Sequence, residues 1–489
     1  ILITEPFVLK SSLNYDNSKK YHATDSAGNP FVLTDFYFGN GGIVDIFRKD
    51  AQQWFWNQHK KQMKIGVEGW WGDLGEPEKH PSGIYHNLKD QGFNRLFKAD
   101  EVHNIYGHKW TKMLFTNFAK EYPEKRLFSL NRSGFAGSQR YGIFPWSGDV
   151  SRNWSGLRAQ LPIMLSMSMS GVPYIHADAG GFAGGEGDNE LYVRWLQFAT
   201  FTPIFRPHGT ALDEIDKNAF SFPSEAALIA QPYQGYAKDA IYLRYAMLPY
   251  NYTLAAKQAL NGAPLVAPMY YYYPSDTTAV GLVDEYFWGE NLLIVPVLQK
   301  EASTGSIYLP KGNWYNFYTG SMSEGNRWTS EKISIHQIPV YVKEGSFIPM
   351  WHPKSGTYQS TAEYTGTKDI DILYYPSAGK SSGTLFNDDG KTKNAVSETI
   401  QFTANPVGNK ITISISSTNE IWYKNGLQRK LTLAVPAEYV RKNINIIEGN
   451  KSLQKQAVDK TFNTSETISF TCIEFSFTGK PVKIEYLLK

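Results

Sequence analysis

The first residue whose surroundings suggest chemistry is Asp73, which directly follows two tryptophans in the segment GVEGWWGDLGEPE (66–78). The apolar half of this segment predicts a strand, so the carboxylate would stand where that strand ends. An ionised aspartate held on a rigid element can attack the anomeric carbon of a sugar and form a covalent intermediate. Glu76 and Glu78 are near enough to orient its neighbours. The spacing is also compatible with an Asp73 that only caps the following turn, and both interpretations stay open here.

A second carboxylate, Asp149, lies between Trp146 and Trp154, downstream of Arg132. A general acid for a glycosidic oxygen needs a raised pKa, which apolar aromatic walls can supply. Arg132 could hold sugar hydroxyls or the nucleophile. The alternative for Asp149 is that it caps a helix that begins in VSRNWSGL.

Two further polar residues follow predicted strands: Asp178, in the glycine-rich segment HADAGGFAGGEGDNELY (176–192), and His208, in FRPHGT. No Gly-Lys-Ser/Thr follows the glycines, so a turn that exposes Asp178 to a pocket is favoured over a phosphate loop. Asp188 is expected to cap the next helix. A lone histidine such as His208 is more often structural than catalytic.

Other site classes find little support. No His, Asp or Glu cluster has the spacing of metal ligands, and NDDGKT (387–392) predicts a β-turn rather than a calcium loop. There is no Gly-x-Ser-x-Gly elbow and no dinucleotide fingerprint. We therefore expect neither a metal nor a cofactor.

The elements that must position these residues alternate between strands and helices up to about residue 262. Helices are predicted over 50–66, 102–123, 156–171, 190–203 and 236–262, and strands over 1–7, 67–73, 126–132, 172–178 and 204–209. Repeated β-then-α units imply a parallel sheet, and at this size a (β/α)8 TIM barrel is favoured. The polar residues follow the strands, which is the catalytic face of such a barrel.

The pattern changes near residue 263 to short alternating strands separated by Gly, Pro, Asn and Asp turns, which predicts β-sandwich modules. We expect a catalytic barrel over 1–262, a proximal β-domain over 263–351 and a distal β-sandwich over 352–489.

Composition narrows the possible partners. The net charge of +3 and the scattered Lys and Arg make nucleic acid an unexpected partner, and no segment reaches the roughly 18 apolar residues of a membrane span. The lone Cys472 excludes an internal disulfide and is expected to be buried. Localisation stays open, with the periplasm or exterior of a bacterium as our expectation. The aromatic content of 15% suits both a core and a sugar-binding cleft.

Together these segments resemble glycoside hydrolase family 31, the family of α-glucosidases and α-xylosidases. Motifs in the order of that family carry the resemblance: ITEPF, GWWGDLGEPE, RSGFAGSQRYGIFPWSGD, HADAGGF, RPHG, LRYAMLPYNYTL, EYFWGENLLIVPVL and LFNDDG. It implies a retaining mechanism with Asp73 as nucleophile and Asp149 as general acid/base. It also implies that the sugar at the cleaved bond is held by Arg132, Asp178 and His208 and walled by Trp70, Trp71 and Trp146.

The sequence departs from the family in two ways. The commoner motif around the nucleophile is Asp-Met-Asn-Glu-Pro, whereas here it is Asp73-Leu74-Gly75-Glu76-Pro77. That variant, with EKHP following, looks like a bacterial subgroup containing oligosaccharide 4-α-glucosyltransferase. Family members also begin with a β-sandwich and the first barrel strands, so we expect an upstream segment to complete the barrel.

The resemblance implies an oligosaccharide substrate, and 4-α-glucosyl transfer between maltooligosaccharides is the expected activity. A hydrolytic α-glucosidase and a catalytically inactive carbohydrate-binding protein are the alternatives. For a retaining pair, the carboxyl groups of Asp73 and Asp149 should be on the order of 5–7 Å apart.

Overall fold

A computed structural model describes residues 1–185, 187–210, 224–351, 369–419, 429–449, 451–461 and 469–489. The chain divides into two compact units, each described here by itself. We call them the N-terminal unit (Ile1–Gly148, Ser170–Ile175 and Lys391–Asn394) and the C-terminal unit (Asp149–Met169, His176–Gly390 and Ala395–Lys489).

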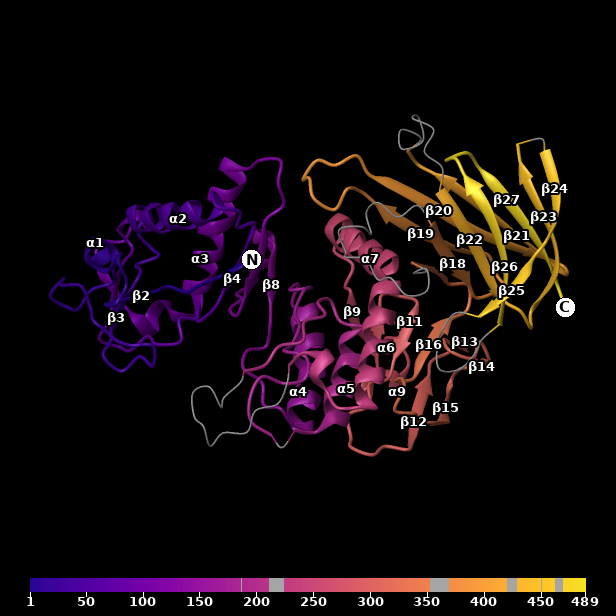
Figure 1. Ribbon diagram of the computed structural model, residues 1–489, viewed down its shortest axis with the longest axis horizontal. Helices are drawn as coiled ribbons and strands as arrows, with labels where there is room; N and C mark the ends of the chain where they lie inside the picture. Colours follow the sequence, from indigo (N-terminus) through magenta and orange to yellow (C-terminus); the bar gives the residue numbers. More distant parts are fainter. Residues whose placement is uncertain (186, 211–223, 352–368, 420–428, 450, 462–468) are drawn as a thin grey trace. The chain divides into compact units, whose positions relative to one another are not determined.

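A four-stranded parallel sheet lies at one side of the N-terminal unit (Figure 1). Its strands, in spatial order, are β1 (Leu2–Thr4), β4 (Gly69–Gly72), β7 (Phe128–Asn131) and β8 (Ile143–Pro145). Thr4 pairs with Gly72, which pairs with Asn131, so the carboxyl ends of the strands reach one edge. The residues that directly follow these ends therefore lie next to one another.

Two long helices of the N-terminal unit, α2 (Lys49–Met63) and α3 (Ala99–Glu121), confirm the predictions over 50–66 and 102–123 (Figure 1). Their buried rings, among them Trp56, Tyr106 and Trp110, form one apolar core. The unit also contains two short antiparallel strand pairs: β2 (Phe7–Leu9) with β3 (Gly41–Ile43), and β5 (Tyr85–Asn87) with β6 (Leu96–Lys98).

The longer helices of the C-terminal unit are α4 (Trp154–Met169), α5 (Asn189–Ala199), α6 (Tyr233–Ala246) and α7 (Leu248–Asn261), and two short ones, α8 (Met269–Tyr272) and α9 (Thr277–Gly281), follow. The predicted single helix over 236–262 is wrong, because α6 ends before Met247 and α7 begins at Leu248. Pro249 explains the break, since it lacks the N–H that a continuous helix would need. The strand predicted over 172–178 is also wrong: only isolated bridges form, at His176 and Ala179, and Pro173 has no N–H for a ladder.

The segment after α7 forms a six-stranded sheet in the order β14-β13-β16-β11-β10-β9 and a two-stranded antiparallel sheet of β12 and β15. These strands are β9 (Val266–Pro268), β10 (Tyr286–Trp288), β11 (Leu292–Ile294), β12 (Thr304–Leu309), β13 (Asn313–Asn316), β14 (Met322–Glu324), β15 (Arg327–Lys332) and β16 (Val340–Lys343).

The last part of the chain is a β-sandwich of two sheets, in the orders β17-β18-β22-β26-β25 and β19-β20-β21-β27-β23-β24 (Figure 1). Its strands are β17 (Phe347–Met350), β18 (Asp369–Tyr374), β19 (Ser381–Asn387), β20 (Glu398–Val407), β21 (Lys410–Ser417), β22 (Arg429–Pro436), β23 (Val440–Glu448), β24 (Lys451–Gln456), β25 (Val458–Thr461), β26 (Ser469–Phe477) and β27 (Val482–Leu488). Alternating side chains from both sheets form its core, and Cys472 is buried as predicted.

Within the described residues, no helix combines the length and the hydrophobicity needed to cross a membrane. The predicted domain boundaries, at 262/263 and 351/352, stay predictions.

Candidate active site

Three residues that follow neighbouring strand ends of the N-terminal unit carry charge: Glu5 after β1, Asp73 after β4 and Arg132 after β7. The backbone of Asp73 donates to Thr4 O at 3.0 Å, and that of Arg132 donates to Gly72 O at 3.1 Å. These bonds extend the strand pairing by one residue, so the sheet itself holds the three side chains at one edge.

Arg132 is the centre of this cluster. Its Nε and Nη2 donate to the two carboxylate oxygens of Glu76 at 2.9 and 3.0 Å, and Nη2 also donates to Glu78 at 2.5 Å. Nε lies 3.6 Å from Oδ1 of Asp73. Burial lowers the pKa of Arg132, but the bonds to Glu76 and Glu78 outweigh this effect and raise it. The guanidinium therefore remains charged beside Asp73.

Asp73 combines both interpretations that the sequence left open. Its Oδ1 accepts the backbone N–H of Leu74 at 2.9 Å, as a turn cap would, and the same oxygen faces Arg132. The side chain is about one-fifth exposed, at 19%. Two donors and partial access suit an ionised nucleophile, although the assignment of that role stays a prediction.

Glu5 is a site residue that the sequence reasoning missed. Burial, together with the charges of Asp73 and Glu78, raises its pKa to about 7, while Arg132 acts in the opposite direction. The sequence placed Glu5 inside the strand predicted over 1–7, whereas β1 ends at Thr4 and leaves Glu5 directly after it. Pro6, which cannot donate to a strand ladder, was the available signal for that earlier end.

The loop after Asp73 packs tightly on α3. A Cβ atom at Gly75 would lie 2.4 Å from the ring of Trp110, and a Cβ at Gly107 would lie 2.8 Å from Gly75 O. Only glycine fits at position 75 without rearrangement. This contact gives a physical reason for the departure from the commoner motif, which has asparagine there.

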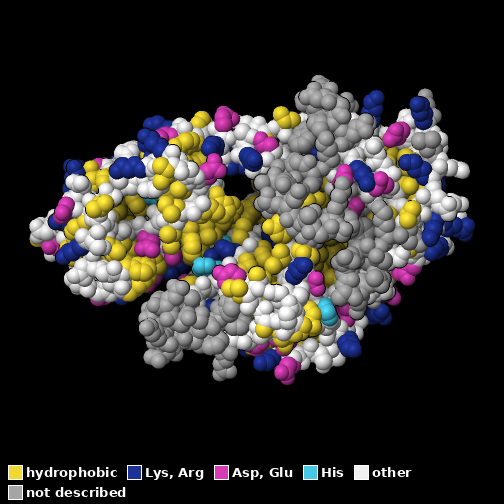
Figure 2. Space-filling view, viewed as in Figure 1, with side chains coloured by type: hydrophobic (Ala, Val, Ile, Leu, Met, Phe, Trp, Pro, Cys, Tyr) yellow, Lys and Arg dark blue, Asp and Glu magenta, His cyan; other side chains and the backbone are white. Residues whose placement is uncertain are grey.

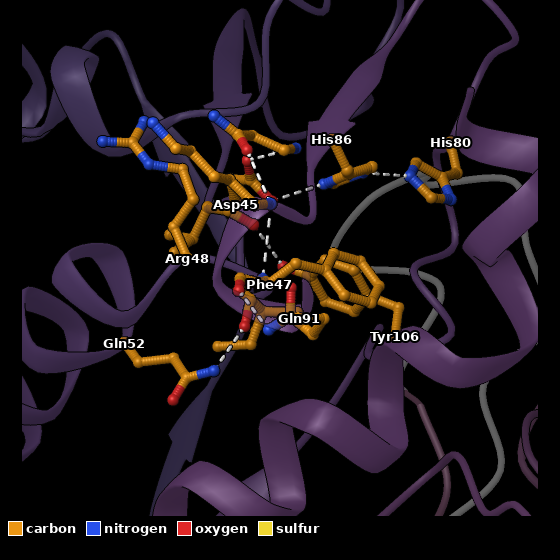
Figure 3. Close-up of polar contacts among 12 residues, drawn as sticks. Asp45, Phe47, Arg48, Gln52, His80, His86, Gln91 and Tyr106 are labelled. Carbon is orange, nitrogen blue, oxygen red and sulfur yellow. Dashed lines mark hydrogen bonds and ion pairs between the residues drawn. The ribbon is translucent and has the colours of Figure 1, made fainter. Parts of the chain in front are cut away.

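The far end of the same loop is held by a chain of histidines (Figure 3). His80 Nε2 contacts His86 Nε2 at 2.7 Å, and His86 Nδ1 contacts the buried Asp45 at 2.9 Å. The other nitrogen of His80 lies 3.1 Å from Nδ1 of His103. Each nitrogen–nitrogen contact needs one donor and one acceptor, and a neutral His80 ring supplies one of each. Burial and the two neighbouring rings lower its pKa to about 2.

The predicted tryptophan walls differ in exposure. Trp71 is partly exposed and meets Trp146 edge to face at 6.1 Å, whereas Trp70 is 2% exposed and packs against His59. The alternation of side chains along β4 explains the difference, because neighbouring residues point to opposite faces. A sugar-facing role for all three tryptophans stays a prediction.

In the C-terminal unit, three segments run side by side after Asp149. The N–H of Phe182 donates to Val150 O at 2.8 Å, and the N–H of Thr210 donates to Phe182 O at 2.9 Å. The buried Arg152 ties the segments together, because its guanidinium donates to the carbonyls of Gly181, Phe182 and Thr210. The sequence reasoning did not identify this arginine.

The same segments hold Asp178 and His208. Asp178 is fully buried and forms an ion pair with Arg206, whose Nε also donates to His176 at 3.2 Å. Burial and the charge of Arg206 lower the pKa of His208 to about 4, so its imidazole is neutral near pH 7. A neutral imidazole and a carboxylate can each hydrogen-bond a sugar hydroxyl.

Asp149 is exposed at the start of this unit. The alternative that it caps α4 is wrong, because Asn153 accepts the N–H of Gly156 at 2.7 Å and performs that role. The predicted cap at Asp188 is confirmed, since its side chain accepts from Leu191 N–H. The structure thus gathers Asp73, Arg132, Trp71 and Trp146 in one unit, and Asp149, Asp178 and His208 in the other.

Sequence relatives of the chain bear the names of an α-glucosidase and a glucosyltransferase. The chain is 31% identical over 374 residues to alpha-glucosidase 2 of Bacillus thermoamyloliquefaciens. The alignment covers 74% of this chain and 45% of that protein. It is 29% identical over 376 residues to a 1,6-alpha-glucosyltransferase of Sporosarcina globispora, covering 73% of this chain and 27% of that protein. The chain thus spans less than half the length of either relative.

A solved structure gives the same fold. A Flavobacterium johnsoniae family 31 dextranase, complexed with glucose, superposes with a TM-score of 0.83 at 24% identity. The superposition covers 100% of this chain and 62% of the dextranase chain. Profiles of the family 31 TIM-barrel domain and of the family 31 C-terminal domain match residues 1–254 and 262–348. These matches confirm the predicted fold class, a partial TIM-barrel domain followed by β-sheet domains. The chain belongs to glycoside hydrolase family 31.

Proposed function

We propose that the protein processes α-linked glucooligosaccharides with retention of configuration. Asp73 attacks the anomeric carbon and displaces the leaving oxygen, which takes a proton from Asp149. The resulting β-linked glycosyl–aspartate is attacked by an acceptor hydroxyl that loses its proton to Asp149. Two inversions retain the α configuration, and both carboxyl groups return to their starting states.

The observation that carries the proposal is the Arg132 cluster at the strand ends. A guanidinium 3.6 Å from Asp73 stabilises its ionised form, which is the form that attacks. Glu76 and Glu78 fix that guanidinium, so the charge does not move away when substrate enters. Membership of family 31 supports the same assignment of Asp73 and Asp149.

For the acceptor, we favour a sugar 4-hydroxyl over water. The Asp-Leu-Gly-Glu-Pro-Glu variant motivates this choice, and a family relative that bears the name of a glucosyltransferase supports transfer within this family. Water is present at about 55 M, so transfer requires a site that binds and orients the acceptor.

Product analysis on maltotriose tests the proposal. Transfer gives both longer and shorter α-1,4 oligosaccharides early, with little net rise in reducing ends. Glucose and maltose without maltotetraose, from the first minutes at millimolar substrate, would identify a hydrolytic α-glucosidase instead. No turnover by the wild type, combined with measurable maltotriose binding, would identify an inactive carbohydrate-binding protein. The Asp73→Asn variant is the blank for contaminating activity.

A further inference from the structure

Two aromatic rings of the N-terminal unit are exposed side by side. Phe36 is buried and lies 4.5 Å from Phe7, so it anchors the segment. The next two residues, Tyr37 and Phe38, are 58% and 53% exposed, with ring centroids 4.4 Å apart. Hydrophobic side chains do reach the surface of this unit on the face drawn in Figure 2. Two adjacent large rings in water, however, forgo the free energy that burial would give, which suggests a ligand.

These rings lie beside the charged cluster. Tyr37 OH donates to Glu78 at 3.5 Å, and Glu78 in turn accepts from Arg132, the neighbour of Asp73. Burial and the charge of Glu78 raise the pKa of Tyr37, against the effect of Arg132, so its hydroxyl stays protonated as a donor. Two side chains, Glu78 and Arg132, thus connect Tyr37 to Asp73. This separation suits contact with the sugar next to the attacked one, not with the attacked sugar itself.

We propose that Tyr37 and Phe38 form a stacking platform for the glucose unit on the acceptor side of the cleaved bond. The apolar C–H face of a pyranose fits an exposed aromatic ring, and the tyrosine hydroxyl and Glu78 offer a donor and an acceptor to its hydroxyls. The inference rests on the proposed function. It makes that function more specific, because the same position holds the leaving sugar in the first step and the acceptor sugar in the second.

The test compares two donors. Maltotriose places glucose units on the acceptor side, whereas α-glucosyl fluoride places none there. In Tyr37→Ala and Phe38→Ala, the KM for maltotriose should rise about tenfold, while the rate of fluoride release in a single turnover, a step that needs no acceptor sugar, stays unchanged. Tyr37→Phe keeps the stacking face and should stay within about threefold of the wild type. Phe93→Ala is the matched control, because Phe93 is also about half exposed, at 49%, but pairs with Phe97 away from the cluster.

The outcomes separate the platform from the function. Equal losses of activity on maltotriose and on α-glucosyl fluoride, or no change on either donor, would overturn the platform. If the wild type only hydrolyses maltotriose but Tyr37→Ala still raises its KM selectively, the platform stands and the transfer assignment fails. If neither donor is turned over, the proposed function fails. Calorimetry with maltotriose then decides: weaker binding by Tyr37→Ala supports the platform, and equal binding overturns it.

Discussion

A single guanidinium within reach of three carboxylates defines the candidate site at the scale of residues. Arg132 binds Glu76 through two parallel bonds and Glu78 through one, and it approaches Asp73 more loosely at 3.6 Å. The tight contacts fix its position, while the looser one leaves the Asp73 carboxylate available to attack. This division of roles needs arginine, because a lysine ammonium lacks the planar fork that binds one carboxylate twice.

Azide rescue tests the two catalytic roles separately. In Asp73→Ala, azide can occupy the vacated space and displace fluoride from α-glucosyl fluoride directly, so one inversion yields the β-glucosyl azide. In Asp149→Ala, the glycosyl–aspartate still forms from this activated donor, and azide then attacks it without base assistance to give the α-glucosyl azide. Each unrescued variant should lose at least about 10³-fold in kcat on maltotriose. NMR of the anomeric proton identifies the product. The same azide anomer from both variants would contradict the assignment.

Glu5 gives a prediction for stability against pH. Its pKa is about 7 in the fold and 4.5 for an ordinary glutamate in the unfolded chain, so between these values only the folded state binds the proton, and stability falls as pH rises. Glu5→Gln removes this fall in stability, because glutamine does not titrate. The variant should be about 1–2 kcal/mol more stable at pH 8, allowing for solvent screening, and no more stable at pH 4. Urea unfolding at both values measures it. The exposed Glu68→Gln is the control, and a gain independent of pH would argue against the mechanism.

At the scale of elements, the sequence predicted α2, α3 and the strands before Asp73 and Arg132 well, because their apolar periodicity and flanking glycines are local signals. Asp73 and Arg132 were found for this reason: each directly follows a predicted strand. The strands predicted over 172–178 and 204–209, before Asp178 and His208, form only isolated bridges. Tyr37 and Arg152 were not found, because their significance depends on contacts with Glu78 and with three separate loops. The 236–262 region shows the limit of periodicity, since the helical pattern continues through Pro249 although the helix does not.

The packing of the Asp73 loop on α3 leads to a prediction about the family's commoner motif. Gly75→Asn introduces the asparagine of that motif, but its Cβ would meet the Trp110 ring at 2.4 Å. We expect a loss of about 1–3 kcal/mol in stability and a marked loss of activity, because the loop that carries Glu76 must shift. Replacing Trp110 with leucine in addition should recover part of the activity. Gly235→Asn is the control, since no atom lies within 4 Å of a Cβ there. A fully active and stable Gly75→Asn would refute the packing argument.

At the scale of the molecule, the candidate residues are divided between two compact units that differ in chemistry. The N-terminal unit contributes Asp73 with its arginine and carboxylates, and the C-terminal unit contributes Asp149, Asp178 and His208. The units also differ in their titratable groups. Buried histidines are spread through the N-terminal unit, whereas the sandwich residues 369–489 of the C-terminal unit contain no histidine.

This difference predicts that acid destabilises the N-terminal unit before it destabilises the sandwich. Burial lowers the pKa of His22 and His59 to about 4, and burial with two neighbouring rings lowers that of His80 to about 2. The unfolded chain takes up these protons near the ordinary histidine pKa of about 6.5. Between pH 6.5 and the folded values, the unfolded state therefore binds more protons, and stability falls as pH falls. At pH 5, each histidine accounts for a loss of up to about 2 kcal/mol in stability.

Hydrogen exchange at pH 7.5 and 5, corrected for intrinsic rates, should show α2 and α3 losing protection while β20 and β21 keep theirs. Equal losses in the helices and the sandwich would show that the histidines do not control the acid response.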